Sequence, residues 1–119
     1  MSREIEEKTV LELGPVEEIP VGEGREYRIG SEEIAVFRAR DNKVYAIQAK
    51  CPHRRASLAD GMIGNGIVVC PFHSYKFDLS CGSALGNDCQ SLQTYKVEIG
   101  ETGQILVSDA RMLRELTNF

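Results

Sequence analysis

The chain has 119 residues, of which 42% are hydrophobic and 27% charged, so it has enough apolar content for one modest core and is unlike a disordered protein. Its net charge of −4 argues against a nucleic-acid-binding protein, which normally carries a basic face. We expect a single cytoplasmic domain over residues 1–119, because the opening MSREIEEK holds no apolar signal segment and no stretch approaches the roughly 20 apolar residues of a membrane span.

The charges are unevenly distributed along the chain. Residues 1–33 hold ten Glu against four Lys or Arg, whereas residues 34–59 hold six Lys or Arg against one Asp. The basic block ends with Lys50, Arg54 and Arg55, which predicts either a solvated basic face or a docking surface for an acidic partner.

Short strands separated by turns dominate the predicted secondary structure. Their β-branched and aromatic content predicts strands at residues 9–14, 25–30, 33–40, 43–49, 67–70, 75–79, 94–99 and 104–109. Asp41 and Asn42 form a hairpin turn, and the glycines between residues 61 and 66 mark a second tight turn. From Asp109 onward, Met112, Leu113 and Leu116 fall on one face of a short helix. The sequence therefore predicts an all-β fold, a small antiparallel barrel or sandwich, with one C-terminal helix.

Two Cys/His pairs indicate a metal site. Cys51 and His53 stand one residue apart, Cys70 and His73 stand two apart, and sixteen residues separate the pairs. Structural zinc sites usually offer two cysteines together and then two histidines. Here each segment supplies one thiolate and one imidazole, so two facing loops can give both thiolates to one iron of a cluster and both imidazoles to the other.

These segments, Cys-Pro-His at 51–53 and Cys-Pro-Phe-His at 70–73, resemble the Rieske [2Fe–2S] motif, and the likeness extends from IAVFRARDNKVYAIQAKCPH to TYKVEI and ILVSD. The resemblance implies a Rieske fold of three small antiparallel sheets, with an inserted cluster-binding subdomain at about residues 50–86. It also implies that Cys51 and Cys70 bind one iron of a single [2Fe–2S] cluster, and that His53 and His73 bind the other.

Departures from the pattern of membrane quinol-oxidising Rieske proteins indicate a different kind of carrier. Those proteins have a disulfide between the two loops, where this chain has Ala56 and Phe72. They also have Ser and Tyr hydroxyls that donate hydrogen bonds to cluster sulfur, where this chain has Tyr75 and Phe77. Fewer such hydrogen bonds destabilise the reduced cluster, so we expect a potential near the low end of the Rieske range, about −150 mV.

The resemblance implies an electron-carrier component with no enzymatic activity of its own. Both histidines are used by the cluster, so no separate non-haem iron site can be built, and no dinucleotide-binding G-x-G-x-x-G is present. CPHRRASLADG, CPFHSYKFDL and CQSLQTYKVEI resemble the small subunit of NAD(P)H nitrite reductase slightly more than the alternative, a ferredoxin between a flavin reductase and an aromatic-ring-hydroxylating dioxygenase. A structural zinc-binding module is the third hypothesis.

The expected partners are a flavin-containing reductase and a terminal oxidoreductase, which is the nitrite reductase large subunit or a dioxygenase. Docking is expected near Lys50, Arg54 and Arg55, with neither nucleic acid nor a membrane as partner. For Cys81 and Cys89, reduced thiols are expected over a disulfide because the protein is expected in the cytoplasm.

Overall fold

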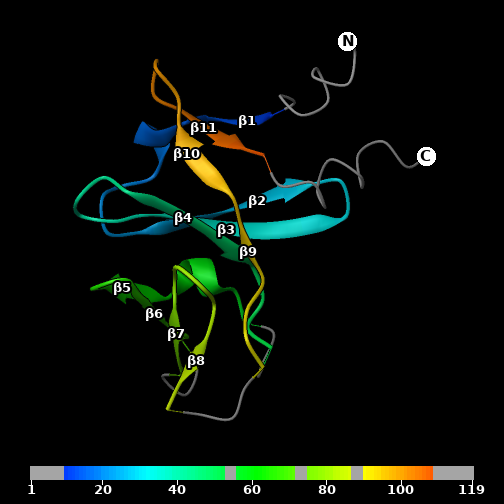
Figure 1. The fold of residues 1–119 in the computed structure, drawn as a ribbon, viewed down its shortest axis with the longest axis vertical. Helices are drawn as coiled ribbons and strands as arrows, with labels where there is room; N and C mark the ends of the chain where they lie inside the picture. The colour runs from blue at the N-terminus through cyan, green and yellow to red at the C-terminus, as the bar shows by residue number, and fades with distance from the viewer. Residues whose placement is uncertain (1–9, 53–55, 72–74, 87–89, 109–119) are drawn as a thin grey trace.

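The computed structural model describes residues 10–52, 56–71, 75–86 and 90–108, and in these ranges the chain forms three antiparallel sheets (Figure 1). The first sheet has the order β1 (Leu11–Pro15), β11 (Gln104–Val107), β10 (Val97–Ile99). The second has the order β2 (Gly24–Ile29), β3 (Glu32–Arg38), β4 (Val44–Gln48), β9 (Thr94–Tyr95). The third has the order β5 (Met62–Gly64), β6 (Ile67–Val69), β7 (Lys76–Asp78), β8 (Ala84–Leu85). Two 3₁₀ turns, η1 (Val16–Glu18) and η2 (Leu58–Asp60), complete the described elements.

The second sheet is the middle layer, because its central strand β3 is buried on both faces. Successive side chains of a strand point to opposite faces, so the unbroken apolar run IAVF serves two cores at once. Ile34 and Val36 pack in a first core with residues of the first sheet, among them Ile105 and Val107. Ala35 and Phe37 pack in a second core, which is shared with the third sheet. The buried members of this second core are Ala35, Phe37, Ile47, Cys51, Leu58, Val68, Cys70, Phe77, Leu79 and Leu92.

The all-β architecture of three small antiparallel sheets is confirmed, and seven of the eight predicted strands occur with small shifts at their ends. The prediction of one strand over residues 94–99 is wrong in detail. The chain leaves the second sheet at Tyr95 and enters the first at Val97, so β9 pairs with β4 while β10 pairs with β11. Strands β5 and β8 were not predicted, because they have three and two residues and lie beside glycines. The predicted C-terminal helix lies outside the described residues.

The turn between β5 and β6 shows why these short strands are paired in one register. Asn65 and Gly66 have φ values of 53° and 76°, which are the left-handed values of a two-residue hairpin turn. The turn places Gly64 opposite Ile67 and Met62 opposite Val69. Val68 and Phe77 then point into the second core from adjacent strands.

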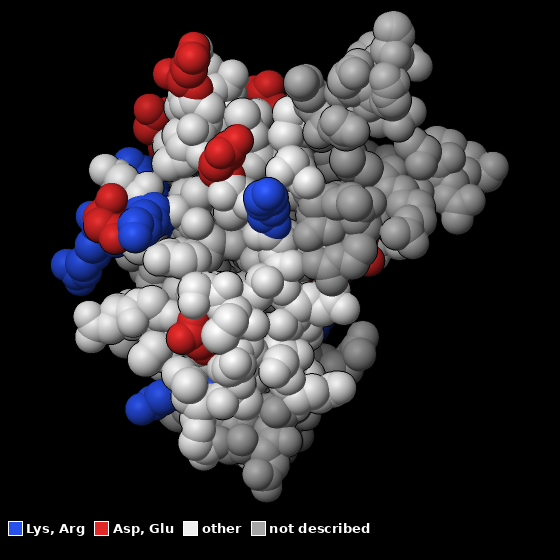
Figure 2. Space-filling view, in the orientation of Figure 1, with Lys and Arg blue, Asp and Glu red and all other residues white. Residues whose placement is uncertain are grey.

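The basic block seen in the sequence is not a single surface. Lys43 and Lys50 lie just beyond opposite ends of β4, which separates them by about 23 Å at the usual rise of a strand. Basic side chains gather at the tip of the β3–β4 hairpin, at the left edge of Figure 2, whereas acidic side chains lie mainly over the first sheet. A docking surface built on Lys50 is therefore distinct from the basic hairpin tip of Arg38, Arg40 and Lys43.

No helix in the described part of the chain has the length and apolarity required to cross a bilayer.

Candidate metal centre

Cys51 opens a segment (51–56) that is closed by backbone pairing at its base. The chain leaves β4, and Lys50 forms an isolated antiparallel bridge with Ser57. Inside that bridge, the Cys51 N–H donates a hydrogen bond of 2.8 Å to the Ala56 carbonyl. The two described ends of the first Cys-Pro segment are thus held side by side.

Cys70 opens a second segment (70–75) with the same construction. Val69, the last residue of β6, pairs with Lys76, the first residue of β7. Inside this pair, the Cys70 N–H donates a hydrogen bond of 2.7 Å to the Tyr75 carbonyl. Both segments therefore enclose six residues, begin with Cys-Pro and close with the same hydrogen bond between residues i and i+5. A matched pair of this kind suits two loops that each deliver one thiolate and one imidazole.

Both cysteine side chains are buried in the second core. Cys51 and Cys70 are 0% and 1% exposed, and they belong to the same apolar group as Phe77 and Leu92. Neither is in a disulfide among the described residues, and Cys81, which is exposed, is free of one as well. Two reduced, buried cysteines at the starts of matched segments fit the thiolate half of a cluster site, since a thiolate at such depth requires a metal or another positive partner.

His53 and His73, the other predicted ligands, lie outside the described residues, as do Arg54, Arg55, Phe72 and Cys89. Within the described ranges, no group of three or more His, Cys, Asp or Glu side chains is gathered around one point. That finding concerns only half of the predicted ligand set, because the described ligands are the two cysteines alone.

The first segment is also held from the side by β2. Glu26 accepts a 2.8 Å hydrogen bond from the Ser57 hydroxyl, and its carboxylate lies 3.5 Å from Lys50 Nζ. Lys50, which was predicted as a docking residue, therefore forms an ion pair with Glu26. The pair is partly exposed, so its contribution to stability is small.

A third segment (78–83) is hydrogen-bonded to Leu92, and Leu92 packs in the same core as Cys51 and Cys70. Asp78 Oδ1 accepts hydrogen bonds from the Ser80 N–H at 2.8 Å and the Ser80 hydroxyl at 2.6 Å, with the Cys81 N–H further away at 3.3 Å. These bonds, first those from Ser80, hold the pKa of the Asp78 carboxyl below its ordinary value. The turn continues to Gly82, whose carbonyl accepts a 2.7 Å hydrogen bond from the Leu92 N–H.

The Asp78 carboxylate should make stability depend on pH in the acid range. Because its pKa is lower in the folded than in the unfolded chain, its contribution is present above the unfolded value, about 4, and is lost as the pH falls through the folded value. We expect Asp78→Asn to lower the thermal midpoint at pH 7 and to have a smaller effect at pH 3. Asp60→Asn is the control, because the Asp60 carboxylate makes no hydrogen bond with the described residues; an equal loss at both pH values for Asp78→Asn would contradict the assignment.

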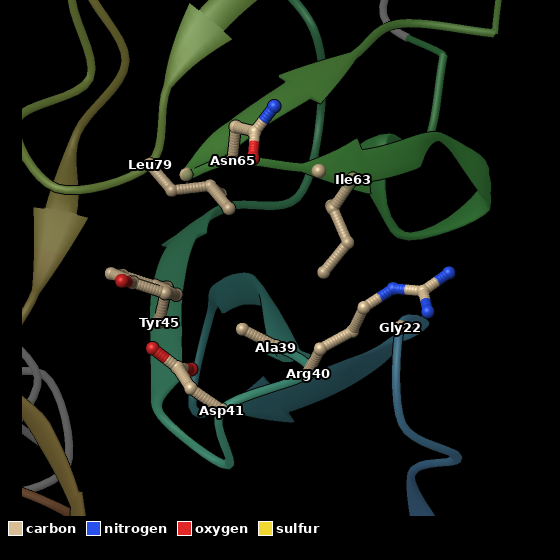
Figure 3. A pocket seen from close by; sticks show the side chains of 10 residues that line it. Gly22, Ala39, Arg40, Asp41, Tyr45, Ile63, Asn65 and Leu79 are labelled. Carbon is tan, nitrogen blue, oxygen red and sulfur yellow. The ribbon is translucent and has the colours of Figure 1, made fainter.

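A cleft of about 640 Å³ between the β3–β4 and β5–β6 hairpins is separate from this site. Arg40, Asp41 and Tyr45 line it from the second sheet, and Ile63, Asn65 and Leu79 face them from the third (Figure 3). Its lining contains neither Cys51 nor Cys70, and it includes both an arginine and an aspartate, whose side chains point to opposite sides in Figure 3. The cleft therefore has no thiolate that could bind a metal, and its lining carries both a positive and a negative side chain.

Sequence reasoning located the described cysteines but missed the residues that support them. Glu26 accepts a hydrogen bond from Ser57, which is 31 positions away in the sequence, and Gln48 donates one to the Lys50 carbonyl, two positions away. Ser57 and Lys50 flank the first segment on its two sides. No motif marks Glu26 or Gln48. The one hint in the sequence is that Gln48 interrupts the otherwise largely apolar run VYAIQA (44–49), whose other polar group is the Tyr45 hydroxyl.

The fold and the site together define a class: a small all-β protein of three antiparallel sheets with two matched Cys-Pro segments whose cysteines are buried in one core. The family model described as the Rieske [2Fe-2S] domain matches residues 9–96. The chain belongs to the Rieske [2Fe–2S] family, whose domain binds a [2Fe–2S] cluster.

Known relatives include both kinds of small Rieske protein. Ferredoxin CarAc of Metapseudomonas resinovorans is 33% identical over 82 residues, which are 68% of this chain and 75% of that protein. A solved complex of reduced oxygenase and oxidized ferredoxin in carbazole 1,9a-dioxygenase matches at 28% identity with a TM-score of 0.72, over 83% of this chain and 92% of that chain. A putative nitrite reductase NADPH small subunit matches at 27% identity with a TM-score of 0.75, over 83% and 97% of the two chains.

Other relatives are much longer than this chain. The 4beta-methylsterol monooxygenase of Methylococcus capsulatus is 38% identical over 55 residues, which are 46% of this chain and only 15% of that protein.

Proposed function

We propose that the protein is a one-electron carrier that works between a flavin-containing reductase and a terminal oxidoreductase, and is not an enzyme on its own. In this proposal Cys51 and Cys70 bind one iron of the [2Fe–2S] cluster, and His53 and His73 bind the other. The cluster, when bound, supplies a site that gains or loses a single electron. The observation that carries the proposal is the pair of matched segments with buried cysteines in one core.

The chain's own residues keep the thiolates in place and exclude water from them. The hydrogen bonds from Cys51 to Ala56 and from Cys70 to Tyr75 fix each cysteine backbone. Phe77 and Leu92 pack in the same core as the thiols and limit the approach of solvent from that side. A rigid, dry thiolate environment suits electron transfer because little has to move when the charge of the site changes.

Two systems are candidates for the terminal acceptor. The resemblance of the cysteine-containing segments favours the nitrite reductase type, and a solved small subunit at 27% identity supports that reading. The 33% identity with a ferredoxin over three quarters of its length favours a carrier to an oxygenase. In both systems the chain has the same role, and we place it in the cytoplasm, where Cys81 and Cys89 remain thiols.

We place the docking surface near Lys50, Arg54 and Arg55. Lys50 is paired with Glu26, so its charge is partly balanced. The positive field that guides an acidic partner would then depend mainly on Arg54 and Arg55.

Charge reversal tests this surface. We expect the double change Arg54→Glu and Arg55→Glu to slow reduction by a flavoprotein reductase about tenfold at low salt and to flatten the dependence on ionic strength. The measurement is stopped-flow bleaching of the visible absorption. Arg40→Glu with Lys43→Glu is the matched control at the other end of β4, and an equal effect of the two reversals would exclude a docking surface near the cluster.

The carrier function itself is tested by anaerobic reductive titration of the cluster-loaded protein. We expect one electron to be taken up per chain, followed by reoxidation when an oxidised acceptor is added. A colourless protein that takes up no electron would identify the alternative, a structural zinc-binding module.

A further inference from the structure

The two Cys-Pro segments differ in how their flanks are supported. The second segment lies between β6 and β7, so the register of the third sheet fixes both of its ends. The first segment follows β4 but is not followed by a strand of the same sheet, and its ends meet in the isolated bridge between Lys50 and Ser57. That bridge has two backbone hydrogen bonds, from the Cys51 N–H to the Ala56 carbonyl at 2.8 Å and from the Leu58 N–H to the Ala49 carbonyl at 2.7 Å. The first segment is therefore flanked by one isolated bridge, whereas the second segment lies between two paired strands of a sheet.

The Gln48 side chain provides a further support for the first segment at the end of β4. Its Nε2 donates a 2.8 Å hydrogen bond to the Lys50 carbonyl, and its Oε1 accepts a 2.8 Å hydrogen bond from the Gln93 N–H. The Gln48 N–H also donates to the Gln93 carbonyl at 2.9 Å. Both polar atoms of the carboxamide are thus hydrogen-bonded, the nitrogen to the backbone at Lys50 and the oxygen to the backbone at Gln93.

The Lys50 carbonyl belongs to the peptide group whose N–H is that of Cys51. This peptide accepts a hydrogen bond from Gln48 at one end and donates one to Ala56 at the other, both at 2.8 Å. A peptide bonded at both ends has little freedom to rotate, and accepting at the carbonyl strengthens the N–H as a donor. The orientation of the backbone at Cys51 is therefore set in part by Gln48.

The other arm of Gln48 reaches the segment that covers the cysteines. Gln93 follows Leu92, which is 4% exposed, belongs to the same core as Cys51 and Cys70, and donates its N–H to the Gly82 carbonyl at 2.7 Å. One carboxamide thus links the first segment to the segment of Leu92.

We propose that Gln48 is a positioning residue for the cluster: it holds the Lys50–Cys51 peptide against the segment of Leu92 and so fixes the Cys51 thiolate. The proposal rests on the proposed function through one assignment, that Cys51 is a ligand of the cluster.

Two variants separate the arms of Gln48. Gln48→Leu removes both side-chain hydrogen bonds at similar volume. Gln48→Glu keeps an acceptor for the Gln93 N–H but, as a carboxylate, has no proton to donate to the Lys50 carbonyl. Gln104→Leu is the control, since Gln104 Oε1 also accepts a backbone hydrogen bond, from the Thr102 N–H at 3.2 Å, in the turn between β10 and β11 and away from the cysteines.

The experiment uses the full cluster-loaded chain and measures the rate of bleaching with excess chelator, together with the EPR line width of the reduced protein. We expect Gln48→Glu to lose the cluster about three- to tenfold faster than the wild type, as the loss of one ordinary hydrogen bond implies. Gln48→Leu, which loses two hydrogen bonds, should lose the cluster at least as fast, and both variants should show broader EPR lines. Gln104→Leu should match the wild type in both measurements.

Each result bears on the proposal. Gln48 variants that match Gln104→Leu in bleaching rate and line width would overturn it, even though the wild-type cluster signal remains. If Gln48→Leu does not fold, the bleaching rate and line width of Gln48→Glu alone test the proposal. If neither Gln48 variant folds while Gln104→Leu does, Gln48 is a general structural residue and the positioning role is excluded. A wild type without any cluster signal would instead contradict the proposed function.

Discussion

Cys70→Ala is expected to abolish the visible absorption and the EPR signal of the protein. Cys70 is 1% exposed and opens the second segment, and alanine leaves no thiolate at that position in the core. An iron–sulfur cluster held by two thiolates and two imidazoles then loses one of its four ligands, and the site no longer retains it. The measurement is the iron content and visible spectrum of the purified variant.

Cys81→Ala is the matched control for this change. Cys81 is exposed, and its sulfur lies 3.3 Å from the Ser83 hydroxyl, outside the core that holds the other two cysteines. Its replacement should leave the cluster content unchanged. Full cluster content in Cys70→Ala, or an equal loss in both variants, would exclude Cys70 as a specific ligand.

Gly82→Ala should be among the most destabilising single changes outside the ligands. Gly82 has φ +82°, and a Cβ there would lie 2.2 Å from the Leu92 carbonyl oxygen. The left-handed backbone costs about 1 kcal/mol for alanine, and the clash with backbone adds more, for a total of about 3 kcal/mol. We expect the thermal midpoint to fall by about 15 °C, measured by far-ultraviolet circular dichroism.

Gly86→Ala isolates the effect of the clash. Gly86 also has a positive φ, +73°, but a Cβ there meets nothing within 4 Å. Alanine should therefore cost only the backbone strain, with a fall of about 5 °C. Equal losses in the two variants would show that the contact between Gly82 and Leu92 does not hold this region together.

Local patterns in the sequence were sufficient to predict most of the strands and the family of the protein. The stretch EIAVFRAR predicted a strand, which the structure shows as β3, and the burial of its IAVF run on both faces agrees with the absence of polar residues in that run. The Cys-Pro pairs predicted two similar loops, and Cys51 and Cys70 do open segments of the same length and closure. These features depend on neighbouring residues, so a sequence displays them directly.

Features that depend on distant residues were not predictable. The division of residues 94–99 between two sheets arises because Tyr95 has its partner in β4 and Val97 has its partner in β11. The hydrogen bond from Ser57 to Glu26 joins residues 31 positions apart. The basic block looked like one surface because its residues are adjacent in sequence, yet β4 separates Lys43 from Lys50.

We propose that one [2Fe–2S] cluster is bound by Cys51, Cys70, His53 and His73. Electron–nuclear double resonance of the dithionite-reduced protein tests it most directly, because it detects nitrogen bound to iron. We expect couplings from two imidazole nitrogens, one of which disappears when His53 or His73 is replaced. A reduced cluster without nitrogen coupling, or a protein with no EPR signal at all, would contradict it.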